Sequence, residues 1–86
     1  MFFITLLHPY TKPRCVAYEP LEWMAISTAK NHIGNESYYD NLVIEHMLNG
    51  VHPDVLKEIW FEWTEGTWKE IEKPIWAKGT TNWAIG

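Results

Sequence analysis

The feature that most constrains this chain is the crowding of tryptophan into its C-terminal third. Residues 59–86 hold five of the six tryptophans in a chain of only 86 residues. A domain of this length has a small core, and large aromatic side chains supply much of the apolar area that such a core needs. We therefore expect residues 59–86 to be tied into the fold and not to form a loose tail.

The composition indicates one small globular domain covering residues 1–86. Apolar residues make up 47% of the chain and charged residues 21%, which is typical of a folded domain. Cys15 is the only cysteine, so there is no internal disulfide framework and a reducing compartment fits best. No apolar run approaches the roughly 20 residues of a membrane-spanning helix, and no signal-peptide pattern is visible. We expect a soluble cytoplasmic protein.

The first third of the chain predicts a β-hairpin followed by a helix. The run at residues 2–7 is apolar at nearly every position, which favours an interior strand covered on both faces. Turn residues separate it from a second strand at residues 14–19. Pro20 suits a first helical turn, an apolar stripe then runs to Ile33, and Gly34 is expected to end this helix in the left-handed conformation.

The remainder predicts two more helices and a closing strand. Residues 37–48 begin with a capping-box-like Ser37 and Asp40, and residues 53–65 begin with a proline in the first turn. Residues 67–72 fit a strand and a short helix equally, and residues 80–85 alternate as a strand does. The predicted fold is therefore a small α+β domain, with an N-terminal β-hairpin and C-terminal strands packed against about three helices. Trp23 lies off its helical stripe and is expected to pack on another element.

Residues 54–65 carry the most informative local pattern if they form a helix. Apolar residues then recur at i, i+3, i+4 and i+7 on one arc, and four acidic residues line the opposite arc. Phe61 falls inside the acidic arc, and an exposed aromatic beside charges is typical of a binding hot spot. We predict that the partner-binding surface comprises Asp54, Glu58, Phe61, Glu62, Glu65 and Trp76.

Several kinds of chemistry are disfavoured by the residues present. The net charge of −4 argues against direct nucleic-acid binding, because that affinity comes from Lys and Arg that neutralise phosphates. Two histidines and two carboxylates surround the junction at residues 45–54, but their spacing is not that of a zinc site. Cys15 beside Arg14 could be an activated thiol, although a small buried hydrophobe is the more ordinary role. We expect no enzyme activity, no metal and no cofactor.

These observations favour a non-enzymatic protein-binding module. An acidic face suits a larger protein with a basic surface, and blocking a nucleic-acid-binding surface of that protein would make the chain an inhibitor. In size, acidity and tryptophan content it resembles the small accessory proteins of bacteriophages and mobile elements, a resemblance that covers no defined stretch. Two alternatives remain open. One is a carbohydrate-binding module with Trp68, Trp76 and Trp83 on one sheet face, and the other is a self-associating homodimer.

Overall fold

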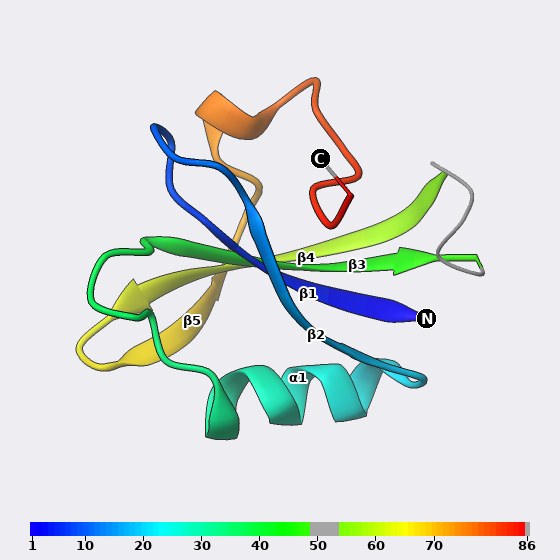
Figure 1. Ribbon diagram of the computed structural model, residues 1–86, viewed down its shortest axis with the longest axis horizontal. Helices are drawn as coiled ribbons and strands as arrows, with labels where there is room; N and C mark the ends of the chain where they lie inside the picture. The colour runs from blue at the N-terminus through cyan, green and yellow to red at the C-terminus, as the bar shows by residue number, and fades with distance from the viewer. Residues whose placement is uncertain (49–53, 86) are drawn as a thin grey trace.

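The computed structural model describes residues 1–48 and 54–85, which form a five-stranded sheet with one α-helix (Figure 1). The helix lies on one face of the sheet, and the chain that follows the last strand crosses the other face. In chain order the elements are β1 (Phe2–Leu7), β2 (Arg14–Glu19), α1 (Glu22–His32), β3 (Asn41–Met47), β4 (Val55–Thr64), β5 (Thr67–Ile71) and the 3₁₀ turn η1 (Ile75–Ala77).

The sheet is antiparallel throughout, in the order β2-β1-β3-β4-β5. The predicted hairpin of β1 and β2 is confirmed, and α1 then carries the chain across β1 to β3. This order places β2 and β5 at the two edges. The α+β class is therefore confirmed, whereas the expectation of about three helices is wrong, because the described residues contain a single α-helix.

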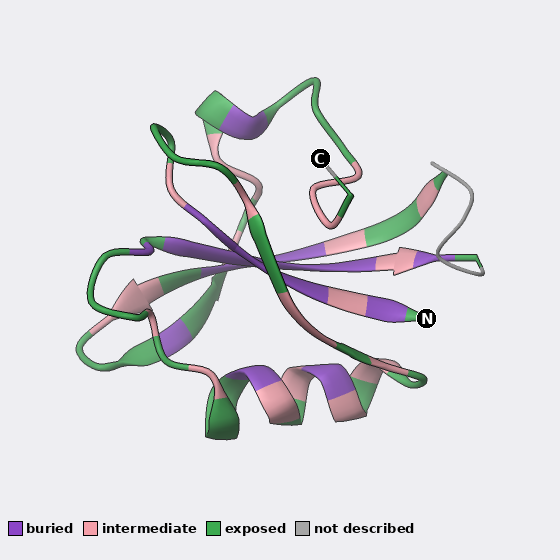
Figure 2. Ribbon diagram, in the orientation of Figure 1, coloured by how far each residue is buried: buried purple, intermediate pink, exposed green. Residues whose placement is uncertain are grey.

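The three central strands, β1, β3 and β4, each contain a stretch of buried residues (Figure 2). Ile4 and Leu6 of β1 join the cluster that faces α1, and Leu7 joins the cluster beneath the C-terminal segment. Alternate residues of a strand point to opposite faces, so a strand covered on both sides is apolar at successive positions. The interior position predicted for β1 is confirmed.

The same two-sided burial explains why two predicted helices are strands. β3 occupies most of the predicted helix 37–48, and β4 occupies most of the predicted helix 53–65. Each carries three consecutive buried apolar residues: Leu42, Val43 and Ile44 in β3, and Ile59, Trp60 and Phe61 in β4. A short apolar run fits a buried helix or a central strand equally, and neighbouring strands decide between them. The predicted junction between these helices, at residues 49–53, lies outside the described residues.

The turn between β4 and β5 replaces the helix end predicted at Gly66. Glu65 and Gly66 both have positive φ, 53° and 78°, and they connect paired Thr64 and Thr67. Two successive residues of positive φ make the tight hairpin connection that matches the twist of the flanking strands. Residues 67–71 are accordingly a strand.

Three smaller expectations about the helix and the C-terminus are also wrong. Gly34 does not adopt a left-handed conformation, and the residues that do so after α1 are Glu36 and Ser37, with φ of 51° and 74°. Trp23 does not pack on another element but is 68% exposed. Residues 80–85 form no strand: residues 80–82 are irregular, residues 83–85 form a turn, and the N–H groups of Asn82 and Ala84 bond to a buried side chain of β3, described below.

Phe61→Ala should destabilise the fold strongly. Phe61 is 1% exposed within the cluster facing α1, and removing a buried phenylalanine side chain leaves a cavity that costs about 3–5 kcal/mol. Leu56→Ala on the same strand is the control, because Leu56 is 56% exposed and should change stability by no more than about 0.5 kcal/mol. Urea unfolding of the two variants measures the difference, and equal unfolding midpoints would show that Phe61 is not core.

Candidate functional site

The strand geometry of β4 separates the residues predicted to bind a partner. Phe61 faces α1 and is buried, so the expected exposed aromatic inside an acidic helical face does not exist. Glu58 and Glu62 have the opposite parity and point to the face crossed by the C-terminal segment. Asp54 is exposed just before β4 begins, and Glu65 is exposed in the turn where it ends. The acidic residues therefore form no single stripe.

Trp76, the sixth predicted residue, belongs to a cluster of three tryptophans on the C-terminal side of the sheet. Trp60, Trp76 and Trp83 meet edge to face, with ring centroids 5.9–6.0 Å apart. Trp60 is 2% exposed whereas Trp76 is 41% exposed, so the cluster extends from the core to the surface. Edge-to-face pairs of this kind add directional stability to the apolar burial.

The other tryptophan pair lies on the opposite face. Trp63 and Trp68 meet at 4.9 Å, and the Trp68 Nε1–H group donates to the carbonyl of Ile33 at 2.7 Å. Trp68 is 2% exposed in the cluster facing α1. Trp68, Trp76 and Trp83 therefore do not share one sheet face, and the platform on which the carbohydrate-binding alternative depended is not formed.

A pair of carboxylates lies beneath the C-terminal segment, and its role was not predicted from the sequence. Glu45 of β3 and Glu58 of β4 are direct cross-strand partners, and Glu45 is fully buried. Both oxygens of Glu45 accept backbone N–H groups from the C-terminal segment: Oε2 from Asn82 at 2.7 Å and Oε1 from Ala84 at 3.0 Å. Glu45 therefore attaches this segment to the sheet.

Glu58 is held in place by a cation and an indole. Its Oε1 lies 2.8 Å from Nζ of Lys73 and accepts the Trp60 Nε1–H group at 3.1 Å. Lys73 also donates to the carbonyl of Thr80 at 2.7 Å and lies 5.8 Å from the centre of a Trp60 ring. The cluster thus joins β3, β4 and two points of the C-terminal segment through polar contacts that little water reaches.

The environment of Glu45 changes its protonation. Burial, followed by a hydrogen bond to Glu58, raises the pKa of Glu45 from 4.5 to about 7, against the opposing effect of the two backbone donors. Glu58 Oε2 is buried and has no hydrogen-bond partner among the described groups, so it is available to accept a hydrogen bond from Glu45 when the Glu45 carboxyl is protonated. Because Glu45 is fully buried and bonds to the backbone of the C-terminal segment, it fastens that segment to the sheet, and we call Glu45 and Glu58 the latch.

In the sequence, Glu45 stands out only as one of four candidate metal ligands, with His46, His52 and Asp54, and His52 lies outside the described residues. Neighbouring residues of a strand point to opposite faces, and His46 instead stacks on Phe2 at 4.1 Å on the α1 side. The signal that could have found the latch is a glutamate inside the otherwise apolar run of β3. In the described parts of the chain, no three His, Cys, Asp or Glu side chains come together as a metal site.

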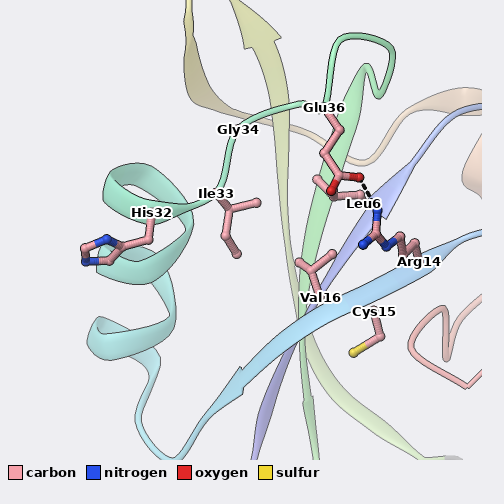
Figure 3. A pocket seen from close by; sticks show the side chains of 8 residues that line it. All are labelled: Leu6, Arg14, Cys15, Val16, His32, Ile33, Gly34 and Glu36. Carbon is pink, nitrogen blue, oxygen red and sulfur yellow. Dashed lines mark hydrogen bonds and ion pairs between the residues drawn. The ribbon is translucent and has the colours of Figure 1, made fainter.

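A cleft of about 390 Å³ opens at the C-terminal end of α1, on the face of the sheet that α1 covers (Figure 3). Its walls come from β2, from the end of α1 and from the loop that follows the helix. Arg14 of β2 and Glu36 of that loop form an ion pair across its mouth. The lining residues are Leu6, Arg14, Cys15, Val16, His32, Ile33, Gly34 and Glu36.

The cleft does not have the features of a thiol active site. Desolvation is the main cause that raises the pKa of Cys15, so the neighbouring Arg14 does not activate the thiol, which donates to the carbonyl of Ala17 at 3.8 Å. His8, which follows β1, faces Asp40 and not the thiol, with Nε2 3.4 Å from Oδ2.

No family model matches this chain, and neither the curated proteins nor the solved structures contain a significant match. Within residues 1–48 and 54–85, no helix is long and apolar enough to cross a membrane. Function must therefore be inferred from the surfaces and side chains of this chain itself.

Titration of Glu45 should make the fold less stable as pH rises. The folded state holds a proton on Glu45 up to about pH 7, whereas an ordinary glutamate loses it near 4.5, so the stabilisation present at low pH is lost between these values. Glu45→Gln keeps the shape of the side chain but cannot ionise. Urea unfolding at pH 5 and pH 8 should show a smaller difference for this variant than for the parent protein.

The matched control is Glu70→Gln, which removes an exposed carboxylate from β5 and leaves the latch intact. It should retain the difference between pH 5 and pH 8 that the parent protein shows. If Glu45→Gln also retains that difference in full, the titrating group is not Glu45.

Proposed function

We propose that this protein is a non-enzymatic protein-binding module that docks on a basic surface of a larger protein. The observation that carries the proposal is the surface of η1. Ile75 is 86% exposed, and Trp76 beside it is 41% exposed. Adjacent exposed apolar side chains on one short turn form a small patch that a partner can cover, and tryptophan is enriched at binding hot spots.

The base of this surface is rigid, which favours binding. Trp76 packs edge to face on buried Trp60, and Ala77, the last residue of the turn, is fully buried. A side chain already held in place loses little conformational freedom when a partner covers it. The partner would therefore meet a preformed aromatic contact.

The charge of the segment that precedes η1 in the chain supports a basic partner. Residues 62–72 carry four glutamates, all exposed, and one lysine, Lys69. Two further lysines, Lys73 and Lys78, flank η1, and Lys73 is already paired with Glu58. Glu62 shares its sheet face with Trp60, two positions away on β4. Acidic groups around an apolar contact attract a positively charged surface and disfavour nucleic acid. Of the residues predicted from sequence, Glu62 and Trp76 support this surface, and Phe61 and Glu58 do not.

Ile75→Ala should weaken partner binding without weakening the fold. An 86% exposed side chain contributes little to stability, but a central interface residue costs on the order of 1–3 kcal/mol of affinity when truncated. Immobilised protein would capture its partner from source-cell extract, and titration calorimetry with the purified partner would compare Ile75→Ala with the parent. Affinity should also fall as salt rises, because exposed charges are screened.

Leu56→Ala is the matched control, since Leu56 is also exposed but lies near the start of β4. Equal affinity of Ile75→Ala and Leu56→Ala would contradict docking through η1. Sedimentation of the purified protein at micromolar concentration tests the homodimer alternative. A dimer that Ile75→Ala dissociates would mean that the surface binds a second copy of this chain.

A further inference from the structure

We propose that the cleft between β2 and α1 binds the free C-terminus of a partner polypeptide. The terminal carboxylate would pair with Arg14, and an apolar last side chain would enter the cleft. The preceding residues would pair with the open edge of β2. This site goes beyond the docking proposed for η1, because it lies on the opposite face of the sheet and uses different chemistry.

The first support is the open edge beside the cleft. Among the described strands, β2 pairs only with β1, so the backbone groups along its outer edge have no strand partner. Such an edge accepts an extended peptide by adding it as a further strand, with main-chain hydrogen bonds for affinity and side-chain pockets for specificity. The cleft begins at the first residues of this strand, where the end of an added peptide could reach it.

The second support is the apolar floor of the cleft. Leu6 is fully buried at its base, and Val16 and Ile33 are partly buried against the same core cluster. The pairing register of β1 and β2 shifts between Ile4 and Thr5, which makes Val16 the extra residue of a β-bulge. Bulges redirect side chains, and here the bulged residue lines the cleft. The volume of about 390 Å³ lies within the usual range of ligand pockets, roughly 300–1,000 Å³.

The third support is the charge at the mouth. The Arg14 side chain is 57% exposed, and a guanidinium binds a carboxylate through two parallel hydrogen bonds. Its carboxylate partner in this structure is Glu36, which occupies the position that a terminal carboxylate of a peptide would take. The Glu36 carboxylate would thus compete with the terminal carboxylate of the peptide for Arg14.

The loop that carries Glu36 is built under backbone strain. Glu36 and the following Ser37 both have positive φ, 51° and 74°, although neither is glycine. Such residues cluster at ligand clamps and switch regions. A peptide carboxylate that takes over Arg14 would release Glu36, and the loop could then relax to make room. The competition between Glu36 and the ligand is the specific consequence that an experiment can detect.

The test is a titration of ¹⁵N-labelled protein with the peptide acetyl-Ala-Thr-Ala-Thr-Leu, as the free acid and as the C-terminal amide. The free acid should shift the amide signals of residues 14–19 and 33–36, with affinity at least tenfold greater than that of the amide. Arg14→Gln should weaken binding of the acid at least tenfold. Lys12→Gln, which removes a nearby exposed charge, should leave it unchanged. Glu36→Gln should tighten it several-fold, because the internal competitor is gone.

Three outcomes would overturn the proposal. Equal affinity for acid and amide would exclude carboxylate recognition, and the absence of any shift at millimolar peptide would exclude the site. If N-acetyl-leucine binds as tightly as the pentapeptide, the cleft is a small-molecule site and the edge of β2 takes no part. Ile75→Ala should leave peptide binding unchanged, so failure at this cleft and failure of docking through η1 give different results.

Discussion

Two hydrogen bonds from the backbone to one buried carboxylate hold the C-terminal segment on the face of the sheet opposite α1. Glu45 accepts the N–H groups of Asn82 and Ala84, and this places the C-terminal segment over the central strands. Without that cover, Val43 and Trp60 would lose their apolar surroundings on that face. Glu58 and Lys73 complete the attachment with a paired charge. A buried carboxylate is costly unless it is hydrogen-bonded or protonated, and this one is both hydrogen-bonded and easily protonated.

The architecture that results has two independent surfaces suited to contact. On the C-terminal side, the tryptophan cluster ends at the surface in η1, where Ile75 and Trp76 are exposed. On the α1 side, the cleft at the start of β2 combines an apolar floor with the pair of Arg14 and Glu36. A sheet covered on both faces separates them. The two docking events proposed above would therefore not block each other sterically.

The failure of the helical interpretation of residues 54–65 has a clear physical cause. Apolar and acidic residues there do recur at helical spacing, but the same residues also satisfy a strand that is buried at its centre. Glu58, Trp60 and Glu62 alternate with Ile59 and Phe61, and each set faces its own core cluster or the solvent beside it. The β-branched and aromatic composition and the turn at Glu65 favoured the strand. Periodicity in a ten-residue window could not distinguish a helix from a strand. Phe61 is predicted to be exposed only if the segment is a helix, so that prediction is wrong as well.

What the sequence determined by itself was the local structure of its first third and the α+β class. The hairpin of β1 and β2 and the helix α1 follow from turn residues, an unbroken apolar run and a helical stripe, all of which act within a few residues. The tertiary structure alone decided that β3 and β4 are strands, that Phe61 is core and that Glu45 is a latch. Each of these depends on cover from distant segments, because an apolar run becomes a central strand only when both of its faces are packed. The site residues were hardest to foresee for the same reason: Arg14 and Glu36, or Glu45 and Asn82, meet only after the sheet has formed.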